Sequence, residues 1–252
     1  MKYFFAFNVI FVLIFVKVLF SQEMNPEAGK LYNEGNALLK AGNYNGAIQK
    51  YDEALKISRD YRILYQKGLA LRKADKLNEA KTVLEESLQL SPNNEAALNA
   101  LGGVFFAMKD FQKSIETFEK VLSVSKNNSF KEKVKKNMAL AYTQLGNDAM
   151  KSGNGQKALE YLNKAVELDK YDSAFLLLAQ LNVELGNYDA AIKAAEDALK
   201  YRNKISKGGP NYYIGLAYKN KGDIAKAKEY LNLAKADPSY KSTAEYQLNL
   251  IK

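Results

Sequence analysis

The chain has 252 residues, of which 37 are lysine or arginine and 28 are aspartate or glutamate, so its formal net charge is +9. It contains no cysteine, histidine or tryptophan. Without thiol or imidazole groups, the chain cannot form disulfides, thiolate or histidine metal sites, or Ser-His and Cys-His nucleophilic pairs. The composition therefore points away from an enzyme, and we expect no cofactor and no metal.

The first 21 residues differ in composition from the rest of the chain. Lys2 precedes an almost entirely apolar run over residues 3–16, and the sequence becomes polar at Gln22, directly after the small residue Ser21. This order is typical of a secretory signal peptide and is similar to that of exported proteins of Gram-negative bacteria. We expect cleavage after Ser21 and a periplasmic location. Extracellular release and an uncleaved membrane anchor are the alternatives.

From about residue 28 to residue 241, small and large apolar residues recur about every 34 residues. The first small position holds Gly35, Gly68, Gly102, Gly146, Ala179 and Gly215. Two further small positions follow at Ala47, Ala80, Ser114, Ala158, Ala191, Ala227 and at Ala54, Ser87, Val121, Ala165, Ala198, Ala234. Between these two lie Tyr51, Leu84, Phe118, Leu162, Ala195 and Leu231. A recurrence at this period predicts amphipathic helix pairs that bury their apolar stripes by stacking.

Glycine and proline mark the turns within and the boundaries between the predicted helix pairs. Glycine occupies the turn inside four of them, where it can adopt the left-handed conformation that ends a helix, at Gly42, Gly153, Gly186 and Gly222. Proline lacks a backbone N–H and is excluded from helix interiors. All four prolines fall at predicted repeat boundaries: Pro26, Pro92, Pro210 and Pro238. The sequence therefore predicts an all-α protein.

These positions closely resemble the tetratricopeptide-repeat family over nearly all of the chain that follows residue 21. The resemblance implies a right-handed α-solenoid of about six helix-turn-helix repeats with a C-terminal capping helix. We expect a signal peptide at 1–21 and a solenoid at 22–252, with repeats at about 28–61, 61–94, 95–128, 139–172, 172–205 and 208–241 and a cap at 239–252. Such proteins are non-enzymatic interaction scaffolds.

Three segments depart from the regular repeat. A ten-residue insert at 129–138 carries Lys131, Lys133, Lys135 and Lys136, and we expect it to lengthen the first helix of the fourth repeat. The glycine-containing loop at 202–210 is predicted to be a flexible joint. The tail at 239–252 has spaced apolar residues and is predicted to cover the last repeat, as terminal repeats require for solubility.

The family resemblance also implies a concave groove, lined by the first helix of each repeat, that holds an extended peptide or a partner helix. Read onto this chain, the candidate binding residues are Tyr32, Asn36, Arg62, Tyr65, Arg72, Lys73, Asn99, Phe106, Asn147 and Tyr212. They are densest in the first two repeats, where arginine and tyrosine suit an acidic or C-terminal peptide. Each residue alone also fits an ordinary solvated helix surface, whereas the face as a whole favours binding.

The pattern separates this chain from one subtype and leaves one alternative role open. The carboxylate-clamp subtype, which binds chaperone tails, needs Lys and Asn at positions where this chain has Tyr32, Leu69 and Ala96, and only Asn36 matches. The alternative is an assembly role at the cell envelope, with the basic surface docking on a membrane or on cell wall. We expect a protein or peptide partner, no nucleic acid, no small-molecule substrate and at most peripheral membrane contact.

Overall fold

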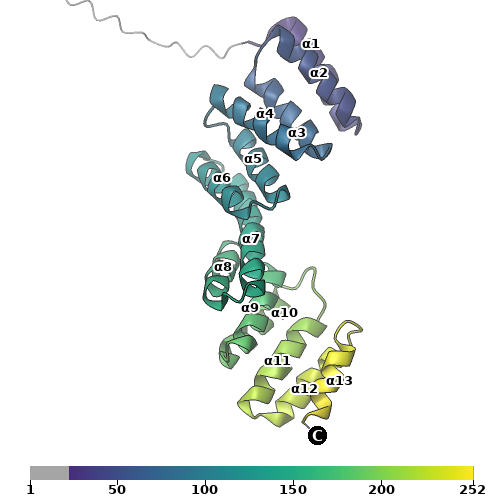
Figure 1. The fold of residues 1–252 in the computed structure, drawn as a ribbon, viewed down its shortest axis with the longest axis vertical. Helices are drawn as coiled ribbons and strands as arrows, with labels where there is room; N and C mark the ends of the chain where they lie inside the picture. Colours follow the sequence, from purple (N-terminus) through teal and green to yellow (C-terminus); the bar gives the residue numbers. More distant parts are fainter. Residues whose placement is uncertain (1–22, 252) are drawn as a thin grey trace, which may run out of the picture.

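The computed structural model describes residues 23–251, so the expected signal peptide lies outside the described residues. Every regular element in this range is an α-helix, and Figure 1 shows the helices stacked in chain order along the longest axis. The helices are α1 (Pro26–Lys40), α2 (Tyr44–Ile57), α3 (Tyr61–Lys73), α4 (Leu77–Leu90), α5 (Glu95–Ala107), α6 (Phe111–Val124), α7 (Asn128–Lys151), α8 (Gly155–Leu168), α9 (Asp172–Glu184), α10 (Tyr188–Lys200), α11 (Gly208–Lys221), α12 (Ile224–Lys235) and α13 (Lys241–Asn249). The predicted all-α solenoid is confirmed.

The turn inside each helix pair follows a common plan. One residue of the turn, one or two positions after the first helix ends, has a positive φ, between 73° and 84° at Gly42, Gly153, Gly186 and Gly222. Asp75 and Lys109 occupy the same place in α3–α4 and α5–α6, with φ values of 59° and 62°. The side chain after this turn then accepts a backbone N–H three residues later and caps the second helix, at Asn43, Asp110, Asn154 and Asp223.

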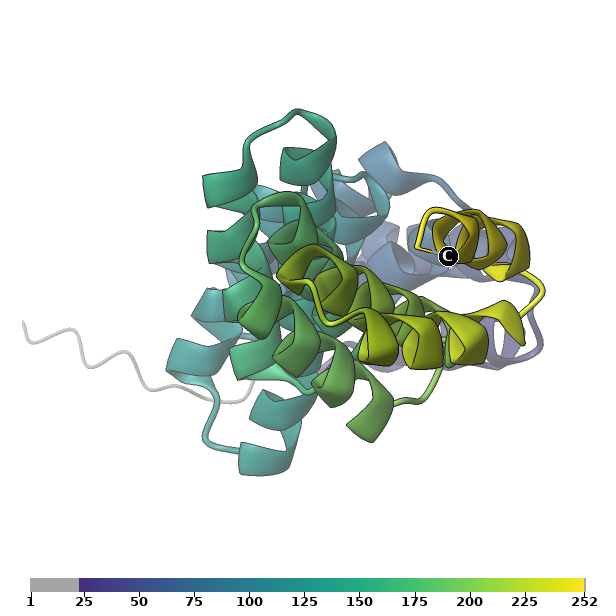
Figure 2. The ribbon, with the colours of Figure 1, turned by 90° about the horizontal axis from the view of Figure 1, so that it is seen from below.

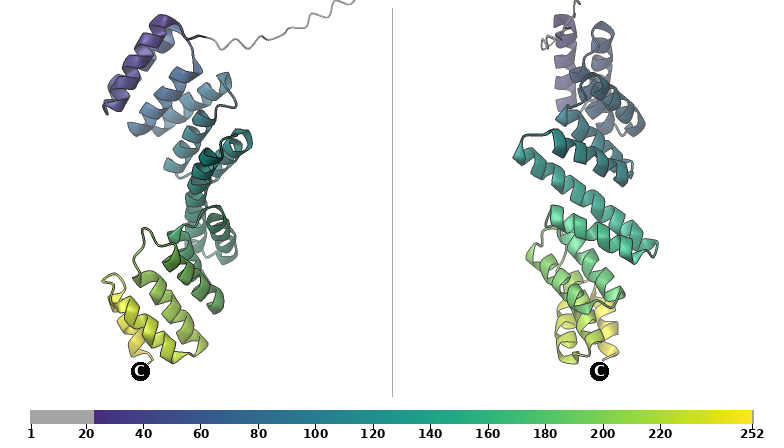
Figure 3. Two further views of the ribbon diagram at one scale, coloured as in Figure 1. Left: turned by 180° about the vertical axis from the view of Figure 1, so that it is seen from behind. Right: turned by 90° about the vertical axis from the view of Figure 1, so that its left-hand side faces the viewer.

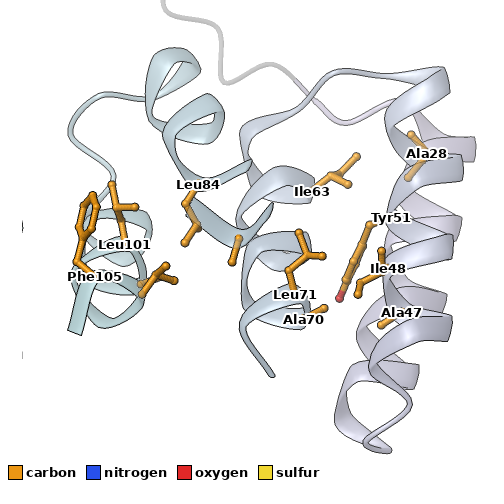
Figure 4. Close-up of a cluster of buried hydrophobic side chains, with 14 residues drawn as sticks. Ala28, Ala47, Ile48, Tyr51, Ile63, Ala70, Leu71, Leu84, Leu101 and Phe105 are labelled. Atoms are coloured by element: carbon orange, nitrogen blue, oxygen red, sulfur yellow. The ribbon is translucent and has the colours of Figure 1, made fainter. Parts of the chain in front are cut away.

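The recurring small residues allow the two helices of a pair to approach closely. A Cβ added to Gly102 would lie 2.6 Å from Cε1 of Phe118, which is closer than atoms can pack. The pair α9–α10 differs at both positions, because Ala179 and Ala195 are alanines, and both are fully buried. In this pair, alanine replaces the glycine of the first helix, and alanine also replaces the larger apolar residue that packs on it from the second helix. Figure 4 shows the N-terminal core, in which the side chains of α2 and α3 face one another.

The insert lies within α7, which has 24 residues whereas the other helices have 9 to 15. Ten residues of α-helix add about 15 Å to its length. The first half of α7 packs Val134 and Met138 against Phe118 of α6, and its second half places Ala149 in a cluster with Leu162 of α8. Figure 3 shows α7 as one unbroken helix between two groups of repeats. The insert thus lets one helix pack into two neighbouring hydrophobic cores.

The loop that follows α10 is fixed by a buried carboxylate. Oδ2 of Asp172, at the start of α9, accepts backbone N–H groups from Asn203, Lys204 and Ile205 at 2.7, 2.6 and 3.1 Å. Asp172 is 1% exposed. Burial opposes its ionisation, but these hydrogen bonds and one from Ser173 outweigh burial and hold its pKa below the usual range. The prediction of a flexible joint is therefore wrong for this part of the loop.

The C-terminal helix α13 covers the last helix pair. Ile251 and Leu248 pack with Leu231 and Ala227 of α12 in a small apolar cluster. Seen along the long axis in Figure 2, successive helix pairs are rotated relative to one another around that axis. Within residues 23–251, no helix combines the length and apolarity needed to cross a membrane.

Candidate functional site

The first helices of successive repeats lie side by side and form the inner surface of the array. Close contacts join α1 to α3, α3 to α5, α5 to α7, and α7 to α9. Figure 1 shows the array bending so that α6 and α8 lie on the outer side and α5, α7 and α9 lie toward the hollow. On this inner surface a pocket of about 250 Å³ is lined by Arg72, Gly103, Phe106, Phe118, Asn137 and Leu140. The pocket therefore spans three consecutive first helices, α3, α5 and α7.

Arg72 supplies the only full charge among the residues that line this pocket. Its guanidinium lies over the backbone of the next repeat, because a Cβ added to Gly103 would be 2.8 Å from Nη1 of Arg72. The side chain is half-buried and forms no ion pair with any other described residue. Its field reaches Tyr65, where burial raises the pKa of the hydroxyl and Arg72 partly offsets that rise. A planar, unpaired guanidinium in such a place can bind a carboxylate through two hydrogen bonds.

The rest of the pocket is mainly apolar. Phe106 and Leu140 form its walls, and Phe118, which is 1% exposed, forms its floor. The Phe106 ring is held in place by edge-to-face packing on Phe111, with ring centroids 5.3 Å apart. An apolar side chain and a carboxylate can therefore be accommodated side by side.

Asn99 presents an unsatisfied acceptor on the same helix as Gly103. Its Oδ1 is buried and has no hydrogen-bond partner within the described part of the chain. Leaving such a group unpaired costs about 1–3 kcal/mol. An extended peptide carries both N–H and C=O groups along its backbone, so it could pair with this amide in either orientation of the side chain. The unpaired amide and the unpaired guanidinium thus lie on neighbouring first helices, α5 and α3.

Three of the predicted groove residues are instead engaged within the fold. Asn36 accepts a hydrogen bond from the hydroxyl of the buried Tyr51 at 2.7 Å, and Tyr32 packs on the same ring. Arg62 turns back to Asp60 at the start of α3, with its Nε 2.9 Å from Oδ1. The guanidinium of Arg62 is therefore paired with the carboxylate that caps its own helix.

The remaining predicted residues divide by position along the array. Lys73 is exposed next to Arg72, and Asn147 is half-buried further along α7. Tyr212 is covered at the C-terminal end, where its ring lies 5.6 Å from that of Tyr240 and its hydroxyl bonds the Gln247 side chain. Burial raises the pKa of Tyr212, and this hydrogen bond lowers it. The capping segment therefore occupies the groove surface at the sixth repeat.

Sequence reasoning missed four of the six pocket residues: Gly103, Phe118, Asn137 and Leu140. Leu140 falls at the groove-facing position of its repeat, so the family pattern could have identified it. Asn137 lies in the insert, and its place in the pocket depends on how α7 packs against α5. Within residues 23–251, no cluster of His, Cys, Asp and Glu residues could hold a metal ion.

Three family models match the chain. The model described as Psidin, N-terminal TPR repeats region, matches residues 36–151, and two models described as Tetratricopeptide repeat match residues 143–210 and 211–236. Together they run without a gap from α1 to the end of α12.

Curated relatives include a large docking-complex subunit. The chain is 25% identical over 204 residues to outer dynein arm-docking complex subunit 4 of Mus musculus, and 24% identical over 173 residues to that of Homo sapiens. These matches cover 80% and 68% of this chain but 28% and 22% of the relatives. The chain thus spans about a quarter of the length of the curated relatives it matches.

Solved structures show the same fold. MamA from Desulfovibrio magneticus RS-1 (residues 41 to the end) is 25% identical, with a TM-score of 0.54 over 71% of this chain and 95% of that one. YrrB, described as a TPR protein with an unusual peptide-binding site, is 19% identical, with a TM-score of 0.54 over 78% and 96%. PilF of Pseudomonas aeruginosa is 18% identical, with a TM-score of 0.54 over 88% and 97%. By its repeats and its fold, the chain belongs to the tetratricopeptide-repeat family.

Proposed function

We propose that this protein is a non-enzymatic interaction scaffold that binds an extended segment of a partner protein on its inner surface. The binding centre is the pocket between α3, α5 and α7, where Arg72 takes a carboxylate and the Phe106–Leu140 walls take an apolar side chain. The cluster that the sequence favours, Arg62, Tyr65, Arg72 and Lys73, contributes Arg72 to this pocket, which extends into the third and fourth repeats.

The observation that carries this proposal is the unpaired state of Arg72. A half-buried charge is costly unless it is paired, and Arg72 has no anionic partner within the described residues. The orphan Oδ1 of Asn99 supports the same conclusion, since both groups gain a partner when a peptide binds. The docking-complex name of the curated relatives is consistent with a scaffold role.

The first test is charge reversal at Arg72. Partner chains are captured from native cells on the immobilised protein, identified, and then measured individually by fluorescence anisotropy. We expect Arg72→Glu to weaken binding at least tenfold, because a charged hydrogen bond contributes about 1.5–3 kcal/mol. The melting temperature should stay within a few degrees of the wild-type value.

The matched control is Lys120→Glu, which makes the same charge change on α6, the outer helix of the third repeat. Lys120 is exposed, so this variant should bind as the wild type does. Equal binding by wild type and Arg72→Glu would contradict the proposal and move the site away from this pocket.

We also propose that the protein acts after export, with the periplasm as the first compartment to test. The support is the order of Lys2, the apolar run at 3–16 and Ser21. Mass spectrometry of the protein from its native cells should find Gln22 at the N-terminus, and cell fractionation should find the protein outside the cytoplasm. A chain that retains residues 1–21 in the cytoplasm would contradict both expectations.

A further inference from the structure

The groove-facing stripe of α7 continues beyond the pocket into the insert. On an α-helix, residues three, four and seven apart share one face. Asn137 and Leu140 line the pocket, so Lys133 and Lys136, each four residues earlier, lie on the same face one turn closer to the helix N-terminus. The inserted lysines therefore lie along the rim of the pocket.

These two lysines are available for a ligand. Both are exposed, and neither forms an ion pair within the described part of the chain. The nearest acid in sequence, Glu132, is taken by Lys135, whose Nζ lies 2.8 Å from Oε1. Of the four lysines of the insert, Lys135 is therefore paired locally, whereas Lys133 and Lys136, on the face of the pocket, have no ion-pair partner within the described residues.

We propose that Lys133 and Lys136 determine specificity, selecting partner segments in which acidic residues lie on one side of the apolar anchor. This inference rests on the proposed function of the pocket. One helical turn is about 5.4 Å and an extended peptide advances about 3.3 Å per residue. For a peptide whose acidic side runs along α7, Lys136 and Lys133 therefore meet carboxylates about two and about three residues from the side chain held by Phe106 and Leu140.

The position of the lysines favours a peptide over a membrane or a nucleic acid. They share a helix face with Asn137 and Leu140, which line a pocket of about 250 Å³. The same pocket holds the guanidinium of Arg72, which has no ion-pair partner within the described residues. A flat lipid surface meets the outer side of a curved array more readily than its hollow. A segment that carries an apolar anchor and carboxylates uses all three features at once.

The test is an array of eight-residue peptides, each with one central Leu or Phe, Gly and Ser elsewhere, and two Asp residues in every placement. Wild-type protein should bind best where Asp lies two and three residues from the anchor on one side. Lys133→Ser with Lys136→Ser should lower binding of those peptides about three- to tenfold, as expected for two exposed ion pairs, while binding of peptides without Asp is unchanged. The difference should disappear in 0.5 M salt, because exposed charges are screened.

The matched control is Lys120→Ser with Lys126→Ser, which removes the same charge from exposed positions outside this stripe and should leave the pattern intact. An acidic preference that persists without Lys133 and Lys136 would overturn the inference. So would equal binding at every Asp placement, or lysine-dependent sedimentation with phosphatidylglycerol vesicles in place of any peptide preference. If no anchored peptide binds wild type, the proposed function itself fails. If binding needs Arg72 but ignores both lysines, only this inference fails.

Discussion

Two polar regions of the array differ in how completely their hydrogen bonds are satisfied. At the α9–α10 end, the buried carboxylate of Asp172 accepts N–H groups from three consecutive loop residues and one neighbour. At the α3–α5 pocket, Arg72 has no anion and Asn99 Oδ1 has no donor within the described residues. A buried polar group that stabilises the fold has its hydrogen bonds made within the protein, as Asp172 does. A buried polar group without such a partner is better explained by a ligand that supplies one.

Replacement of Asp172 should have the largest effect on stability. Asp172→Ala removes a buried carboxylate that three loop N–H groups share as their acceptor, so we expect the free energy of unfolding to fall by about 3 kcal/mol. Urea denaturation followed by circular dichroism would measure this loss. Peptide binding at 10 °C, where the variant remains folded, should be unchanged. A loss below about 1 kcal/mol would show that water replaces the carboxylate at little cost.

Lowering the pH should cause a gradual loss of the stability that Asp172 contributes. The pKa of Asp172 is lower in the folded than in the unfolded chain, so its contribution to stability is complete above the unfolded value of about 4 and is lost as the pH falls through the folded value. The protection of the amides of 203–205 against hydrogen exchange, measured relative to the intrinsic rate at each pH, should therefore fall below pH 4. In Asp172→Asn the protection of these amides relative to the intrinsic rate should no longer change with pH over this range.

Removing the unpaired acceptor of Asn99 should change stability and peptide binding in opposite directions. Asn99→Leu removes an acceptor that has no partner, so we expect the free energy of unfolding to rise by about 1 kcal/mol while affinity for the anchored peptides falls. Thermal denaturation and anisotropy on the same preparation would measure both quantities. Reduced stability together with unchanged binding would show that Asn99 belongs to the fold.

The smallest expected change concerns backbone strain at a turn, away from both regions. Lys109 has φ 62°, which costs a side chain free energy that glycine avoids. Lys109→Gly should stabilise the protein by about 0.5–1 kcal/mol without changing peptide affinity. The same substitution at Lys126, which has no positive φ, should not stabilise and serves as the control.

The regular part of this structure follows from short-range patterns. The spacing of small residues predicts the helix pairs, and the turn glycines predict where four of the six first helices end, because both depend on contacts within one repeat. The hydrogen bonds that hold the loop after α10 on the Asp172 carboxylate could not be predicted in this way, since Asp172 lies 31 residues before Asn203 in the chain. Arg62 and Asn36 were assigned to the groove by position, but the nearby Asp60 and Tyr51 bind them first.

The long helix α7 also has a consequence for how the protein unfolds. In a repeat array each repeat is stabilised only by its own contacts and by those with its neighbours. Here α7 makes all the substantial helix–helix contacts that connect α1–α6 with α8–α13. One continuous helix therefore carries the thermodynamic coupling between the two halves of the described chain. A helix-breaking residue near Tyr142, between the two cores that α7 serves, should turn one cooperative melting transition into two.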